Sequence, residues 1–139
     1  MDWDGIPFWE VFLWVMILNT FMYLVALCRD DHSIIDVAWG PMFVVADLCV
    51  LYRRSPVLLE EEQTSPVIIL VFSLTLIWAV RLAFHTAIRH QGEDWRYTRM
   101  RESWSGCPLP CRALCSYVWI FLMDALFSIC CNAAGLHVL

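Results

Sequence analysis

The chain has 139 residues, of which 60% are hydrophobic and 17% charged, and its formal net charge is −5. So short a chain cannot bury this much apolar surface in a water-soluble core, because an average soluble protein is only about 45–50% apolar. The composition excludes a disordered chain, a collagen and a nucleic-acid-binding domain, and it predicts one integral membrane domain over residues 1–139.

Four long apolar runs predict four transmembrane helices, at about residues 8–28, 34–52, 66–88 and 113–131. Each run has about the 20 residues that a helix needs to cross a ~30 Å hydrocarbon layer. Helices are expected because lipid offers no hydrogen-bond partners to open backbone groups. The predicted fold class is therefore all-α, an integral membrane bundle of four transmembrane helices.

The distribution of arginines predicts the orientation of these helices. The second loop carries Arg53 and Arg54, whereas the first and third loops and their flanks carry Arg29, Arg89, Arg96, Arg99, Arg101 and Arg112. The positive-inside rule therefore predicts that the first and third loops face the cytosol, or the matrix in a mitochondrial membrane. The polar stretches that follow residues 29 and 89 are expected to meet at this membrane face.

Besides Glu10 near the start of the first run, four charged residues interrupt the apolar runs, namely Asp36, Asp47, Arg81 and Asp124. A charge deep in a bilayer costs about 2.5–3.5 kcal/mol unless it pairs, reaches water or lines a wet cavity. Asp36 and Arg81 indicate either a polar pocket or a simple interfacial pair. Asp47 is expected to reach the far surface, and Asp124 to face a protein partner inside or outside this chain.

The remaining polar motifs point to no metal site. The seven cysteines are interpreted as reduced, packed thiols, and the cysteines at 107, 111 and 115 lack the second ligand pair of a zinc site. The arginines at 96, 99 and 101 either hold a phosphate or meet lipid headgroups. Residues 50–54 (VLYRR) match the loose pattern proposed for cholesterol contact.

Three segments resemble motifs of the steroid 5-alpha-reductase-like membrane oxidoreductases. Residues 31–40 (DHSIIDVAWG) are similar to the SxxDxxWG segment of that family, residues 78–85 (WAVRLAFH) to its WxxRLxxH helix, and residues 89–101 (RHQGEDWRYTRMR) to its RxxGEDxRYxxxR loop. Enzymes of the family reduce carbon–carbon double bonds of enone lipids with NADPH inside a helical bundle. The resemblance covers roughly residues 30–105, which correspond to the N-terminal half of the family.

The resemblance also implies a set of site residues. The cofactor-binding candidates are Asp36, Trp39, Arg81, Glu93, Asp94, Arg96, Arg99 and Arg101. The candidate proton donors of a reduction are His85 and Tyr97. The later His-Pro-Asn-Tyr-Phe-Gly-Glu stretch of the family, which supplies much of the cofactor and substrate pocket, does not occur in this sequence.

Two hypotheses about function follow. The favoured one is a non-catalytic accessory subunit without a cofactor, packed among other membrane protein subunits and lipids, which a mitochondrial inner membrane would suit. The alternative is an NADPH-dependent reductase of enone lipids or steroids, completed by another chain and placed by the resemblance in the endoplasmic reticulum. A lipid- or sterol-binding module is a third, minor hypothesis.

Overall fold

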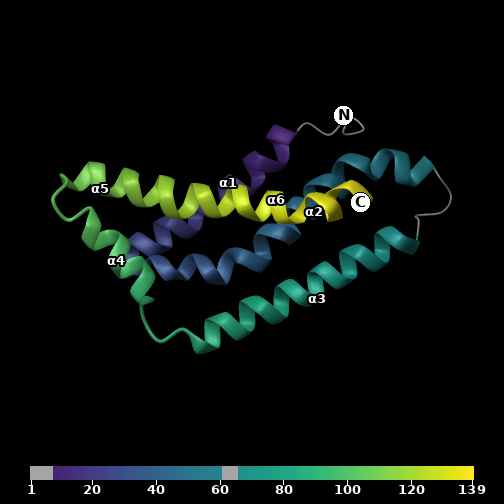
Figure 1. Ribbon diagram of the computed structural model, residues 1–139. Helices are drawn as coiled ribbons and strands as arrows, with labels where there is room; N and C mark the ends of the chain where they lie inside the picture. Colours follow the sequence, from purple (N-terminus) through teal and green to yellow (C-terminus); the bar gives the residue numbers. More distant parts are fainter. Residues whose placement is uncertain (1–7, 61–65) are drawn as a thin grey trace.

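The computed structural model describes residues 8–60 and 66–139, and the regular structure within these ranges is entirely helical (Figure 1). Four helical segments are long and apolar enough to cross a membrane, at Phe8–Arg29, His32–Ser55, Pro66–Arg89 and Leu109–Leu136. The predicted all-α bundle of four transmembrane helices is therefore confirmed. Each predicted span lies inside one of these segments.

The elements follow one another as three long helices, an interfacial helix and a composite last span. Their bounds are α1 Phe8–Arg29, the 3₁₀ turn η1 His32–Ile34, α2 Ile35–Glu60, α3 Pro66–Arg89, α4 Trp95–Ser103, α5 Leu109–Ser116, the π-helical segment η2 Tyr117–Leu122 and α6 Met123–Val138. The α4 helix was not predicted, because it carries no apolar run, and the π-helical geometry of η2 was not predicted, although its residues lie within the span predicted at 113–131.

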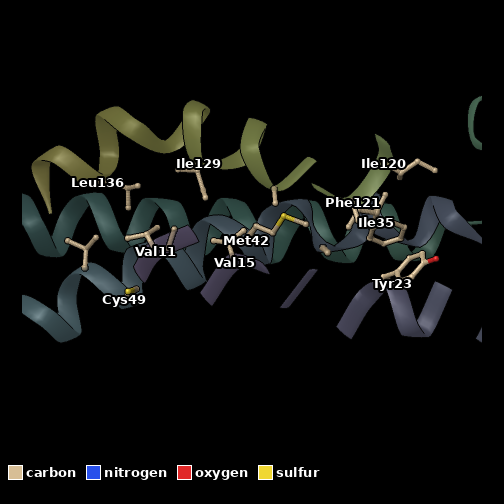
Figure 2. Packing of buried hydrophobic residues seen from close by; sticks show 14 of the residues in the cluster. Val11, Val15, Tyr23, Ile35, Met42, Cys49, Ile120, Phe121, Ile129 and Leu136 are labelled. Atoms are coloured by element: carbon tan, nitrogen blue, oxygen red, sulfur yellow. The ribbon is translucent and has the colours of Figure 1, made fainter. Parts of the chain in front are cut away.

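The core lies between α1, α2 and the last span. The α2 helix contacts α1, α3 and α6, whereas α1 and the last span also contact each other. Figure 2 shows Val15 of α1, Met42 of α2 and Phe121 of η2 in this interior, and all three are fully buried. The α3 helix runs along the edge of the bundle in Figure 1 and joins it chiefly through α2.

The contact between α2 and α3 depends on a single glycine. A Cβ atom at Gly40 would lie 2.7 Å from the carbonyl oxygen and 2.9 Å from the Cα of Ala79. Only glycine permits backbones to approach this closely. Within α3, all of which is described, Ala79 is the only buried residue. Ile68, Val71 and Phe72 are half-buried against the core, and most of the other α3 residues are exposed, so α3 is held along a narrow line.

Polar side chains inside the spans make contacts between helices. The buried Asn19 side chain of α1 donates a hydrogen bond to the carbonyl oxygen of Phe121. That carbonyl lies in the π-helical segment, where the shifted backbone pattern disturbs the usual i to i+4 pairing. Asn19 thus stabilises an irregular stretch of the last span.

The prediction that Asp47 reaches the far surface is wrong. Asp47 is fully buried and accepts a hydrogen bond of 2.6 Å from Nδ2 of Asn132 on α6. Its other oxygen has no hydrogen-bond partner among the described residues. The α6 helix supplies a polar partner inside the bundle, so the carboxyl group does not need to reach the interface.

Candidate functional site

Two loops that lie far apart in the sequence form one polar cluster at the end of the bundle where α1 ends and α2 begins. The backbone nitrogen of His32 donates to Oε1 of Glu93 at 3.0 Å, and the backbone nitrogen of Asp94 donates to Oγ of Ser33 at 3.2 Å. The two stretches predicted to share a membrane face are therefore in direct contact.

The first of these loops is shaped by two aspartates. Asp30 has a left-handed backbone (φ 51°), which ends α1 and reverses the chain. Asp31 then caps the 3₁₀ turn, since its Oδ1 accepts from the backbone nitrogen of Ser33 at 3.0 Å and from Oγ of Ser33 at 2.6 Å. This geometry turns His32 and Ser33 inward, and both are buried.

A histidine from the second loop joins Asp31. Nε2 of His90 lies 2.6 Å from Oδ2 of Asp31. Burial acts to raise the pKa of Asp31, but the hydrogen bonds from Ser33 and His90, together with the charge of His90, outweigh it and lower that pKa. Asp31 therefore remains a carboxylate that ties the two loops together.

The second loop begins α4 with a capping aspartate. Gly92 has a φ of +107°, a backbone conformation that side chains other than glycine rarely adopt. Asp94 accepts from the backbone nitrogen of Arg96 at 2.9 Å, which satisfies one of the free donors in the first turn of α4. The motif GED therefore forms a turn and a helix cap, and its Glu93 and Asp94 side chains remain close to η1.

Asp36 of α2 binds two residues of α4. The hydroxyl group of Tyr97 donates to Oδ1 of Asp36 at 2.6 Å, and a guanidinium nitrogen of Arg96 lies 3.3 Å from Oδ2. Burial and the hydrogen bond to Asp36 raise the pKa of Tyr97, which keeps the phenol protonated. Arg96 also makes two side-chain hydrogen bonds of 3.0 Å to Asp94.

Arg101 occupies the opposite side of the same cluster. Its guanidinium lies 2.8 Å from Oδ1 of Asp30, 3.4 Å from Oε1 of Glu93 and 3.3 Å from Nδ1 of His32. The second oxygen of Glu93 accepts from Oγ1 of Thr98 at 3.2 Å. The guanidinium groups of Arg96 and Arg101 are therefore both engaged with carboxylates of this chain.

The structure divides the predicted site residues into two groups. It brings together Asp36, Glu93, Asp94, Arg96, Tyr97 and Arg101. It leaves Trp39 packed against Phe43 at a ring-centroid distance of 5.8 Å, and it places Arg81 and Arg99 on exposed surfaces. Within the described residues, neither Arg81 nor Arg99 makes a hydrogen bond or an ion pair.

His85 lies beside the cluster, on the wall of an open groove of about 420 Å³. Asp36, Arg89, His90 and Asp94 line the same groove. Two carboxylates thus face this space together with a single arginine, Arg89, and the other cationic side chains of the cluster are already paired. The phosphates of a dinucleotide need free cationic donors, and among the arginines Arg89 alone lines this groove.

Sequence reasoning missed several members of the cluster. Asp31, His32, Ser33 and His90 contribute hydrogen bonds but were not among the candidate site residues. The available signal was the spacing of Asp31 and Ser33, because an aspartate two residues before a serine favours a local capping turn. Asp124, which was expected to meet a partner, has one buried oxygen with no hydrogen-bond partner in the described part of the chain.

Comparison with protein families identifies a match. A family model described as "Protein of unknown function (DUF1295)" matches residues 22–137. No curated protein and no solved structure matches the chain. The matched region runs from within α1 to the last turn of α6 and includes the whole polar cluster.

Proposed function

The chain belongs to the DUF1295 family and is a helical integral membrane protein, and from this premise we propose that it is a non-catalytic accessory subunit of a larger membrane protein complex. In this proposal α3 packs against a membrane-spanning helix of another subunit. The mitochondrial inner membrane is the proposed location.

The observation that carries the proposal is the position of Arg81. This arginine is exposed on α3, eight residues before the helix ends at Arg89, which places it about 12 Å along the helix from that end. A charge at the centre of a membrane helix costs about 2.5–3.5 kcal/mol. A carboxylate on a neighbouring transmembrane helix would remove this penalty, so α3 is suited to a partner with an acidic residue at that depth.

The closed polar cluster supports the same proposal. Arg96 ties α4 to the start of α2 through Asp36, and Arg101 ties α4 to the loop after α1 through Asp30. A cluster that satisfies its own charges stabilises a scaffold, whereas a phosphate site needs cationic groups that are free to bind. The chemistry of a reductase is therefore not required to explain why these residues lie together.

Photo-crosslinking along α3 tests the proposal in intact membranes. A photoreactive amino acid replaces Ile77 or Phe84, which lie four and three residues from Arg81 and share its helix face. We expect crosslinks to a second membrane protein from both positions, and fewer from Phe21, an equally exposed position on α1. Crosslinks to lipid alone would contradict the proposal.

Copurification in a mild detergent provides a second test. Arg81→Leu is expected to reduce recovery of the partner at least tenfold, because the partner's acidic residue loses its counter-charge in lipid. Arg99→Leu is the matched control, since Arg99 is exposed on α4 outside the spans. Equal losses in both variants would show that the arginine at 81 has no special role.

The groove beside Asp36 supports a second candidate function, a reductase of enone lipids completed by another chain. Asp36 binds the protonated Tyr97 and, with His85, lines this groove, so proton donors lie near a space open to a substrate. NADPH would supply the hydride when bound, and the endoplasmic reticulum would be the location. NADPH-dependent reduction that is lost in Tyr97→Phe would support this candidate over the accessory subunit.

A further inference from the structure

A pair of cysteines lies at the turn between α4 and α5, at one end of the bundle (Figure 1). All seven cysteines of the chain are free thiols, and the side chains of Cys107 and Cys111 form a hydrogen bond with each other. Cys107 precedes the last membrane span, and Cys111 lies in its first turn. Neither the polar cluster nor the α3 surface uses this pair.

The backbone on both sides holds the two thiols near each other. The backbone nitrogen of Cys107 donates to the carbonyl oxygen of Trp104 at 2.9 Å, and the backbone nitrogen of Arg112 donates to the carbonyl oxygen of Pro108 at 3.0 Å. Two of the three residues between the cysteines are prolines, whose rings fix the backbone φ angle. Because the side chains already form a hydrogen bond, a disulfide between them requires side-chain rotation and no rearrangement of the spans.

The two thiols differ in exposure and in protonation. Cys111 is exposed, whereas Cys107 is half-buried. The hydrogen bond to Cys111 and the negative charge of its thiolate raise the pKa of the Cys107 thiol, although Arg112 acts to lower it. Cys107 therefore stays protonated while it donates to a Cys111 thiolate. This is the division between an attacking and a resolving thiol that disulfide exchange uses.

An arginine supplies positive charge beside the pair. Nη2 of Arg112 donates to the carbonyl oxygen of Ser105 at 3.0 Å, which turns the guanidinium back toward the loop. In the described part of the chain, Arg112 makes no ion pair with a carboxylate. A positive charge near a cysteine favours the thiolate and attracts an anionic reactant. The arginine distribution predicts that this loop faces the cytosol or the matrix, and glutathione is an anionic thiol that keeps cytosolic cysteines reduced.

We propose that Cys107 and Cys111 form a thiol–disulfide exchange site whose substrate is a small anionic disulfide such as glutathione disulfide. The Cys111 thiolate attacks one sulfur of the substrate, forms a mixed disulfide and releases one glutathione. The Cys107 thiol then loses its proton to water, attacks the sulfur of Cys111 and releases the second glutathione. Each leaving thiolate takes up a proton, so the chain loses two electrons and two protons while one glutathione disulfide becomes two molecules of glutathione.

The test uses the full chain in phospholipid nanodiscs, which leave both membrane faces open to the buffer, and glutathione disulfide as the probe. Trypsin cleaves after Arg101 and Arg112, so both cysteines fall in one peptide, residues 102–112. After the remaining thiols are alkylated, we expect mass spectrometry to show this peptide without alkyl groups and two hydrogen atoms lighter than its reduced form. It should form at least tenfold faster than glutathione adds to Cys28, an exposed cysteine on α1.

Serine variants separate the roles of the two thiols. Cys107→Ser should arrest the reaction at the mixed disulfide, so that Cys111 keeps its glutathione. Cys111→Ser should slow glutathione addition to Cys107 at least fivefold, because the attacking thiolate is gone. Cys115→Ser is the matched control, since Cys115 is a half-buried cysteine one turn further along α5, and it should leave disulfide formation unchanged.

Three outcomes would overturn the proposal. The first is a disulfide peptide that forms no faster than the adduct at Cys28. The second is glutathione that stays on Cys111 of the unaltered chain, which would show that Cys107 does not resolve the mixed disulfide. The third is an equal effect of Cys107→Ser and Cys115→Ser. The first two are measured on the unaltered chain, so the test does not depend on how the variants fold or on the proposed accessory role.

Discussion

The helices α2 and α3 are similar as sequences and very different as parts of the structure. Both are apolar and long enough to cross a membrane, and α3 is the more hydrophobic, with a mean hydropathy of 2.4 against 1.9. Nevertheless 44% of the α2 span is buried in the bundle and only 6% of the α3 span. Hydropathy therefore identifies which segments enter the bilayer, whereas small and polar residues determine which of them become the core.

The physical reason lies in how helices associate in lipid. An apolar side chain gains little by leaving lipid for a protein interior, so close backbone approach and polar contacts decide the packing. The α2 helix has Gly40 against Ala79 and Asp47 against Asn132. The α3 helix, by contrast, has an exposed face that carries Ile77 and Arg81.

The largest expected effect comes from closing the space between α2 and α3. Gly40→Leu places side-chain atoms where the Ala79 backbone lies, and we expect it to destabilise the bundle by about 3 kcal/mol or to detach α3. Unfolding in mixed micelles and a disulfide crosslink between α2 and α3 measure the two outcomes. Gly106→Ala is the control, because a Cβ there meets nothing within 4 Å. An unchanged crosslink in Gly40→Leu would disprove the narrow contact line.

The buried hydrogen bond of α2 is expected to have an intermediate effect. Asn132→Leu removes the 2.6 Å hydrogen bond to Asp47 and should cost about 1–2 kcal/mol of unfolding free energy, because the carboxyl group is buried. Adding Asp47→Leu should restore most of this loss, since an apolar pair of similar size needs no hydrogen bond. A double variant less stable than Asn132→Leu would contradict this explanation.

Acid is expected to loosen the polar end of α2 while leaving the spans intact. The folded state lowers the pKa of Asp31, so its stabilising effect is complete above the ordinary carboxyl pKa of about 3.9 and is lost as the pH falls through the lower folded value. Faster hydrogen exchange at residues 30–34 and 90–95 below pH 4 would report this. His90→Ala should remove the contact between Asp31 and His90 at every pH and so reduce the pH dependence.

The smallest expected effect belongs to Arg96. Its side chain is 56% exposed, and exposed ion pairs contribute about 0–1 kcal/mol. Arg96→Gln should therefore change stability by less than about 0.5 kcal/mol, whereas Tyr97→Phe, which removes the shorter hydrogen bond to Asp36, should cost about 1 kcal/mol. Equal losses in the two variants would mean that the Arg96 ion pair contributes as much to holding α4 as the hydrogen bond of Tyr97 does.

Much of the candidate site was predictable from the sequence because it lies on the first and third loops, which four successive spans place on the same side of the membrane. Charge counting placed residues 30–33 and 92–97 at one face, and the structure shows them in contact. The roles of Trp39, Arg81 and Arg99 were not predictable, since the orientation of a side chain depends on the rotation of its helix in the bundle. The α4 helix was missed because its stability comes from the Asp94 cap and the contact with Asp36.

The sequence alone determined the number of spans, their limits and the face that gathers the charges, because hydrophobicity over about 20 residues is a property of each segment. Only the tertiary structure decided which helix is central, which polar groups are satisfied and which surfaces are free. These features depend on pairs such as Asn19 with Phe121 and Gly40 with Ala79, whose members lie far apart along the chain. Such a pair contributes to stability only when the two helices are packed together, so its contribution cannot be read from either segment alone.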